Sequence, residues 1–94
     1  MPSLPKGAPR LAAKARLRWD KREQKYLLIY PERGILLNAS AGAILSRCDG
    51  VRTIDAIVLE LATSTEDADA ARIRADVEAF LDEMRKRGVL EIVE

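Results

Sequence analysis

Residues 26–38 read YLLIYPERGILLN, and their pattern predicts a β-hairpin followed by the start of a helix. Its first five residues are aromatic and branched, which is the composition of a β-strand. The tetrapeptide Pro31-Glu32-Arg33-Gly34 has turn chemistry, because proline presets φ and glycine is free to take a positive φ. The apolar residues 35–37 then predict a further strand, so the stretch forms a β-hairpin. Asn38 follows directly, and its side chain can accept from the open N–H groups at the start of a helix.

The residues before the hairpin predict one more strand. From Ala15 onward apolar and charged residues alternate, with Leu17 and Trp19 on one face. Such alternation is typical of a half-buried strand. Together with the hairpin, this strand predicts a three-stranded antiparallel sheet. Residues 1–14 are rich in proline and basic residues, so we expect a flexible basic N-terminal arm there.

Three helices are predicted after residue 38, each with apolar residues at helical spacing. The three apolar sets are Ala41, Ile44, Leu45 and Cys48; Ile54, Ile57, Val58 and Leu61; and Ile73, Val77, Phe80, Leu81 and Met84. Thr53 is suited to cap the second helix, and Gly50 and Gly88 are suited to end the first and third. Acidic side chains at residues 66–69 favour the start of the third helix, and a short extended segment closes the chain.

Strands followed by helices indicate an α+β fold and not a parallel βαβ sheet. Three helices beside a small antiparallel sheet resemble a winged-helix arrangement. The length of 94 residues and the mass of 10.4 kDa fit one domain. We therefore divide the chain into the arm of residues 1–14 and one domain of residues 15–94.

The composition disfavours an enzyme. The chain has no histidine, which removes the commonest general base and the commonest zinc ligand. The single cysteine, Cys48, is predicted on a buried helix face beside Asp49, where a thiolate is disfavoured. No glycine pattern suited to holding phosphate occurs. We expect no catalytic residue, no bound metal and no cofactor.

The sequence predicts neither a membrane-spanning helix nor a secretory signal. No apolar run approaches the ~20 residues of a membrane-spanning helix. The first residues contain basic side chains, but no long apolar segment follows them, so they do not form a secretory signal. We expect a cytoplasmic protein.

Charge is distributed unevenly along the chain. Residues 1–47 carry ten Lys and Arg against three Asp and Glu, a net charge of +7, whereas residues 48–94 have a net charge of −6. This asymmetry suggests a charged partner or association between two copies. We expect a monomer in dilute solution and a domain-swapped homodimer at high concentration. Nucleic acid is disfavoured, because residues 66–87 carry seven acidic against five basic side chains.

An extended peptide is the partner that the predicted elements fit best. A third strand at the edge of the sheet would offer free backbone groups, and the last helix would supply an apolar wall beside it. The candidate peptide-binding residues are Ile35, Leu36, Leu37 and Asn38 on the strand and Arg74, Val77 and Arg85 on the helix. The arginines would suit an acidic peptide. Alternation puts Ile35 and Leu37 on one face and Leu36 on the other, and leaves open which face packs inward.

Four stretches together resemble the pyrroloquinoline quinone biosynthesis protein D (PqqD) family. They are residues 28–38, similar to that family's "LLYPEG…LN" signature; residues 41–50, similar to "A..IL..CDG"; Thr53-Ile54 with Ile57; and Asp76-Val77 with Phe80-Leu81, similar to "DV..FL". Their order and spacing match the family from about Leu17 to Leu90. Arg33 is a departure, because the family more usually passes straight from Glu to Gly.

The resemblance implies a peptide-recognition domain and not a catalyst. PqqD-like proteins bind the ribosomal precursor peptide PqqA and present it to the radical SAM enzyme PqqE, which cross-links a Glu and a Tyr on the way to the cofactor PQQ. The same small fold recurs as the recognition element of other ribosomally made, modified peptides. Two rival hypotheses are a winged-helix DNA-binding regulator and a binder of quinone intermediates or minor enzyme of the same pathway.

Overall fold

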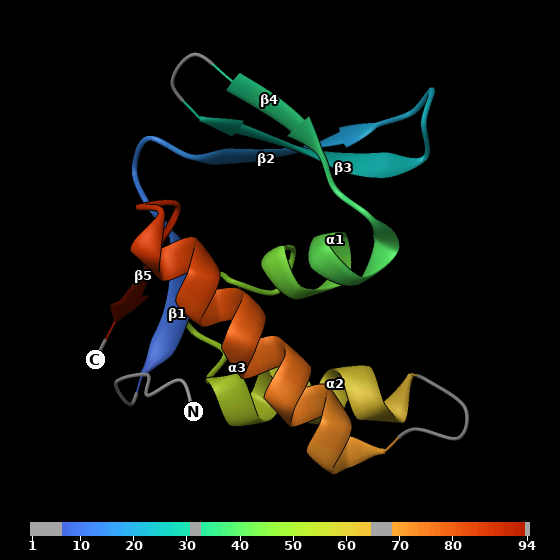
Figure 1. Cartoon of the computed structure of the whole chain (residues 1–94), viewed down its shortest axis with the longest axis vertical. Coiled ribbons are helices and arrows are strands. Elements are labelled where there is room, and N and C mark those ends of the chain that lie inside the picture. The colour runs from blue at the N-terminus through green and yellow to red at the C-terminus, as the bar shows by residue number, and fades with distance from the viewer. Residues whose placement is uncertain (1–6, 31–32, 65–68, 94) are drawn as a thin grey trace.

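The computed structural model describes residues 7–30, 33–64 and 69–93. The elements in these residues are, in chain order, β1 (Ala8–Leu11), β2 (Arg16–Asp20), β3 (Lys25–Tyr30), β4 (Arg33–Leu36), α1 (Ala39–Leu45), α2 (Ile54–Thr63), α3 (Ala70–Lys86) and β5 (Leu90–Val93). Figure 1 shows one sheet of β2, β3 and β4 with α1 beneath it and with α2 and α3 further below. The predicted α+β class is confirmed, and the arrangement is compatible with a winged-helix-like fold.

The three-stranded sheet is antiparallel, in the order β2-β3-β4, as predicted. Its register places Leu17 opposite Leu28 and Leu28 opposite Ile35. Leu28 is only 2 % exposed, so this side packs on the core, and we call it the inner face. The other side, which we call the outer face, carries Arg18, Leu27 and Leu36 side by side.

The connection between β3 and β4 differs from its prediction. Gly34 was expected in the turn, where it could take a positive φ. It belongs instead to β4, opposite Ile29, and is not among the described glycines with a positive φ. Pro31 and Glu32 lie outside the described residues.

The prediction of a flexible arm over residues 1–14 is wrong for its second part. Ala8–Leu11 form β1, which pairs antiparallel with β5, so that Ala8 lies opposite Val93. Ala8 and Pro9 are buried, and the Pro9 carbonyl accepts a hydrogen bond of 3.0 Å from the Gly50 N–H. Proline has no backbone N–H to donate, and a strand that pairs with only one neighbour tolerates this loss. The packed chain therefore begins before the predicted boundary at residue 15, while residues 1–6 lie outside the described part.

The predicted caps are confirmed. The Asn38 side chain accepts from the Ala41 N–H at 2.8 Å, and the Thr53 hydroxyl accepts from the Ala56 N–H at 3.1 Å. Gly50 and Gly88 have φ values of 79° and 78°, as chain reversals after a helix require. Two helix ends differ: α1 stops at Leu45, before Cys48, and α3 starts after the cap Asp69, with residues 66 and 67 outside the described part.

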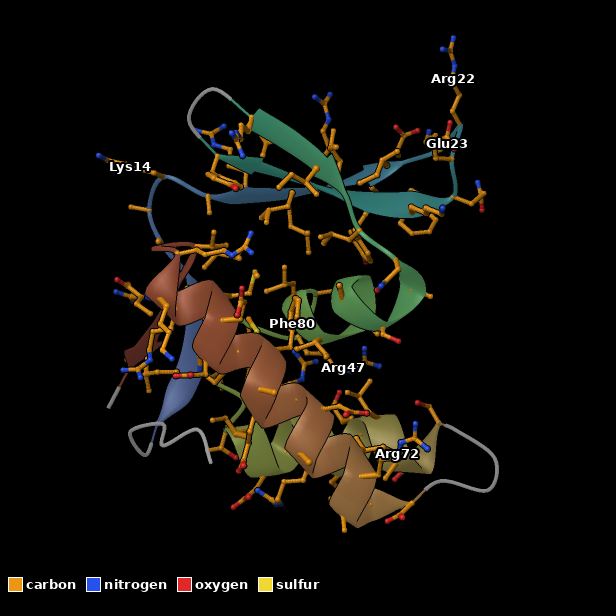
Figure 2. All side chains as sticks on the ribbon, in the orientation of Figure 1. Lys14, Arg22, Glu23, Arg47, Arg72 and Phe80 are labelled. Atoms are coloured by element: carbon orange, nitrogen blue, oxygen red, sulfur yellow. The ribbon has the colours of Figure 1, made fainter. Side chains whose placement is uncertain are left out.

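The core lies between the inner face of the sheet and the three helices. Its most fully buried side chains are Leu28, Leu45, Ile57, Val77, Leu81 and Val89. Phe80, expected in the core, is partly buried and packs against this cluster; Figure 2 shows it reaching from α3 toward α1. None of the helices that the structure describes is long and apolar enough to cross a membrane.

Candidate functional site

The free edge of β4 is the first part of the candidate site. β4 lies at the end of the strand order, so its side away from β3 has no neighbouring strand among the described residues. Ile35 is 36 % exposed and Leu36 is 46 % exposed, which is unusual for large apolar side chains in a strand. An exposed edge of this kind is a template for an added strand.

The register determines which backbone groups of β4 are free. The Leu37 N–H donates to the Tyr26 carbonyl at 2.8 Å, so Leu37 bonds toward β3. Alternate residues of an antiparallel pair bond to the partner strand, so Ile35 also bonds toward β3. Gly34 and Leu36 therefore direct their N–H and C=O groups to the open side. These two residues would supply the hydrogen bonds to an added strand.

A cleft between α1 and α3 is the second part of the site. It has a volume of about 380 Å³, and its wall includes the N-terminal end of α1, which begins three residues after β4 ends. Its walls are Ala39, Ser40, Ala43 and Ile44 of α1, Leu61 of α2, and Ile73, Asp76 and Val77 of α3. Because the α1 side chains at this wall are mostly small, the helix leaves room for side chains of a bound segment.

Two of the strand residues predicted for the site are used by the fold. Leu37 lies beyond the end of β4 and is 8 % exposed, so its side chain belongs to the core. The Asn38 side chain caps α1. The open edge therefore runs over residues 33–36 and not 35–38. Since Leu37 packs inward, Ile35 shares the inner side of the sheet and Leu36 faces outward, which settles the alternation that the sequence left open.

The helix residues predicted for the site are not gathered at this cleft. Val77 lines its floor, although it is only 1 % exposed. Arg74 turns to the opposite flank of α3, where its guanidinium lies 2.6 Å from the Asp55 carboxylate of α2. This bond with Asp55 raises the pKa of Arg74 above its usual value. Arg85 lies 11 residues after Arg74, which is ~16 Å along the helix axis. Its guanidinium pairs with the Asp82 carboxylate at 3.1 Å.

The charge at the cleft is therefore the reverse of the expected one. Asp76, which is exposed, lies at the cleft in place of the predicted arginines. The sequence held one usable signal that was missed. The run ASAGA at residues 39–43 consists of small side chains, and a helix of small side chains next to a neighbouring element leaves a groove.

Cys48 has no features of a reactive thiol. It is buried, and its Sγ donates to the Ile44 carbonyl at 3.3 Å. Burial, aided by the negative charge of Asp49, raises the pKa of the thiol from 9.0 to about 12. A neutral thiol is a poor nucleophile at physiological pH. Across residues 7–30, 33–64 and 69–93, no three His, Cys, Asp or Glu side chains group as metal ligands.

The cations at the C-terminal end of α3 are paired with carboxylates, whereas Arg72 in its first turn has no carboxylate partner within the described residues. Arg85 and Lys86 both contact Asp82, and Arg87 contacts Glu83. These contacts lower the pKa of Asp82, with the hydrogen bond from Lys86 as the largest cause. A recognition helix that holds DNA needs cations that are free to contact phosphate. The pairing therefore gives no support to the DNA-binding alternative.

A family model described as Coenzyme PQQ synthesis protein D (PqqD) matches residues 25–90. This range runs from β3 to the start of β5 and contains both the open edge and the cleft. The chain belongs to the PqqD family. The resemblance carried by the four sequence stretches is thereby confirmed.

Members of the PqqD family from several bacteria are similar to this chain over most of its length. The PqqA binding protein of Rhodopseudomonas palustris (strain BisB5) is 39 % identical over 82 residues, covering 87 % of this chain and 79 % of that protein. The PqqA binding protein of Stutzerimonas stutzeri (strain A1501) is 38 % identical over 77 residues, covering 82 % of each.

A solved structure of the PqqD family has the same fold. The NMR structure of the PqqD truncation of Methylobacterium extorquens PqqCD, described as a stand-alone recognition element for ribosomally synthesized and post-translationally modified peptides, superposes with a TM-score of 0.73. It is 38 % identical in sequence, and the match covers 88 % of this chain and 87 % of that chain.

Proposed function

We propose that this protein binds the precursor peptide PqqA in the cytoplasm and presents it to the radical SAM enzyme PqqE during PQQ biosynthesis. Its relatives in Rhodopseudomonas palustris and Stutzerimonas stutzeri are named PqqA binding proteins, which supports the choice of peptide. The similar Methylobacterium extorquens structure is described as a recognition element for modified peptides, which supports a role in recognition. The proposed role is non-catalytic.

The observation that carries the proposal is the open edge of β4 beside the α1–α3 cleft. An extended peptide that pairs with Gly34 and Leu36 gains backbone hydrogen bonds, and its side chains alternate between the two faces of the sheet. Side chains on the inner face would lie next to Ile35, and the cleft wall at Ala39 and Ser40 begins three residues after the end of β4. Backbone bonds provide affinity in this mode, and the cleft provides selectivity.

The test uses two substitutions at Leu36 and synthetic PqqA, titrated by calorimetry. Leu36→Pro removes the N–H that points to the open side, and proline is tolerated on an edge strand. Leu36→Ala keeps the N–H and removes most of the side chain. We expect L36P to weaken PqqA binding about tenfold or more and L36A to change it less than about twofold, because backbone bonds dominate strand addition.

Two outcomes would overturn this assignment. Either L36P binds PqqA as tightly as the unsubstituted chain, or L36A weakens binding as much as L36P. Thermal melting of both variants excludes unfolding as the cause. In parallel, amide shift mapping of the unsubstituted chain should show PqqA perturbing residues 33–36, 39–44 and 73–77. A titration with duplex DNA tests the rival DNA-binding hypothesis, and we expect it to show no binding.

A further inference from the structure

The outer face of the β2-β3-β4 sheet is apolar at its centre and uncovered. Leu36 is 46 % exposed, and Leu27, its cross-strand neighbour, is partly exposed. Ile29 lies opposite Gly34, which has no side chain to cover it. None of these three apolar side chains belongs to the set that packs against the core. In Figure 1 the described helices all lie on the other side of this sheet.

Cations border this apolar centre. The register places Arg16 opposite Ile29, Arg18 opposite Leu27, and Lys25 opposite Asp20, all on the outer face. The three basic side chains are exposed, and none has a carboxylate partner within the described residues. Asp20 is already engaged, because its carboxylate accepts from the backbone N–H groups of the β2–β3 turn.

This arrangement contrasts with the helical part of the molecule. Apart from Arg72, the basic side chains of that part each contact an Asp or Glu; they are Arg47, Arg52, Arg74, Arg85, Lys86 and Arg87. The outer face thus holds positive charge that the described part of the chain does not neutralise. Such a surface complements a partner whose own apolar surface is bordered by carboxylates.

The outer face is also continuous with the proposed peptide site. A strand added to the open edge of β4 extends the sheet, and alternate side chains of that strand project from the outer face beside Gly34 and Leu36. A protein that covers Leu27, Ile29 and Leu36 would therefore contact the bound peptide as well. This is the geometry that presentation of a peptide to a second protein requires.

We propose that the outer face is the surface on which the peptide-modifying enzyme docks, through an apolar surface bordered by acidic side chains. The proposal rests on the function proposed above and adds the location of the second partner. A second copy of this chain fits less well, because face-to-face pairing of two outer faces would bring Arg16, Arg18 and Lys25 against one another. A nucleic acid would satisfy the cations but would leave the three apolar side chains uncovered.

The test measures binding of PqqE to the full chain in the presence of PqqA. The test variant is Arg16→Glu with Arg18→Glu. The control variant is Lys14→Glu with Arg72→Glu, which changes the net charge by the same amount at exposed positions, one in the β1–β2 connection and one on α3, outside the three strands of the outer face (Figure 2). A third variant, Ile29→Thr, removes apolar surface but keeps a β-branched residue in the strand. Thermal melting of every variant reports on folding.

We expect the R16E/R18E variant to weaken PqqE binding about tenfold or more and the control variant to change it less than about twofold. The I29T variant should weaken PqqE binding about threefold or more. The affinity of all three variants for PqqA alone should stay within about twofold of the unsubstituted chain, because the β4 edge is unchanged.

Several results would overturn the proposal. They are an equal loss of PqqE affinity in both double variants, an unchanged PqqE affinity in R16E/R18E, or a parallel loss of PqqA affinity. A loss of binding to duplex DNA or RNA by R16E/R18E, with PqqE binding intact, would reassign the face to nucleic acid. If the unsubstituted chain fails to bind PqqA, the proposed function fails; if it binds PqqA but not PqqE, only the present proposal fails.

Discussion

Gly42 shows how closely α1 packs on the sheet. A methyl group at this position would come within 2.9 Å of Cδ2 of Tyr26. The Tyr26 ring also contacts Trp19 edge-to-face at a centroid distance of 5.0 Å, so a shift of the ring away from α1 would disturb that contact. The absence of a side chain at Gly42 therefore lets α1 approach Tyr26 of β3 closely.

We predict that Gly42→Ala lowers the free energy of unfolding by about 1–2 kcal/mol, because the steric cost exceeds the gain of about 1 kcal/mol in helix propensity. Urea unfolding measures the effect. The control is the same substitution in a Tyr26→Leu background, where the contact is relieved and G42A should stabilise the protein. A gain in stability in the unsubstituted background would contradict the prediction.

Cys48 gives the stability a predictable dependence on alkaline pH. The buried thiol keeps its proton up to about pH 12, whereas in the unfolded chain it ionises near its usual pKa of 9.0. Ionisation therefore favours the unfolded chain as the pH rises between these values, and stability falls by at most about 1.4 kcal/mol per pH unit. Below the unfolded pKa the thiol contributes no pH dependence.

The measurement is urea unfolding of the unsubstituted chain and Cys48→Ala at about pH 8 and about pH 10. The difference in stability between the two pH values should be smaller for C48A by up to about 1.4 kcal/mol. Equal pH dependence of the two proteins would show that the thiol ionises as easily in the fold as outside it. Other groups that titrate in this range are common to both proteins and cancel.

At the scale of elements, the small side chains of α1 make the α1–α3 cleft accessible. Ser40 is exposed, lies in the first turn of α1 and lines the cleft. We predict that Ser40→Leu fills the cleft and weakens PqqA binding about fivefold or more, with little effect on stability, because leucine is a good helix former at an exposed position. Calorimetry gives the affinity and thermal melting gives the stability.

The matched control is Ala71→Leu. Ala71 is also exposed, also lies in the first turn of its helix, and lines the separate pocket between α2 and α3. The A71L variant should bind PqqA as the unsubstituted chain does. Equal loss in both variants would place the peptide elsewhere.

The same helix shows how far a sequence pattern can locate a site. The apolar stripe predicts correctly that Val77 and Leu81 face the core of the fold. It cannot say which neighbouring element lies along each flank of the stripe. Arg74 and Asp76 are two residues apart, yet Arg74 reaches α2 and Asp76 reaches the cleft. The capping side chains Asn38 and Thr53, by contrast, act within one turn, so local sequence predicts them well.

At the scale of the whole molecule, the pairing of β1 with β5 was the largest feature that the sequence did not predict. The two strands join the first and last parts of the described chain, and no local pattern encodes a contact over that separation. Pro9 also favoured the prediction of an irregular N-terminal arm, because proline lacks a backbone N–H. Its carbonyl nevertheless bonds to Gly50, and the Ala12 N–H bonds to the Val89 carbonyl at 2.8 Å, so these residues are part of the fold.

We predict that deletion of residues 1–11 lowers the free energy of unfolding by at least about 2 kcal/mol, because it uncovers the apolar side of β5. PqqA affinity of the folded fraction should be unchanged, since β4 belongs to the other sheet. Arg10→Ala is the control: it removes only an exposed ion pair with Glu91 and should cost less than about 1 kcal/mol. Unchanged stability after the deletion would show that β1 is dispensable.

The pairing of β1 with β5 also offers a route to self-association. An edge strand such as β1 can pair with β5 of a second copy, which gives a domain-swapped dimer without new kinds of contact. We predict a monomer in dilute solution and a dimer at high concentration. Light scattering across a concentration series tests this, and a constant molar mass up to the highest concentration would contradict it.

The antiparallel match of Ala8 with Val93 has a consequence for protein architecture. Because the first and last strands lie side by side, a polypeptide joined to either end enters the domain at the same corner. That corner belongs to the small sheet, whereas the open edge of β4 and the outer face belong to the other sheet (Figure 1). The fold can therefore be tethered to a neighbouring enzyme through either terminus, in either gene order, with its recognition surfaces left free.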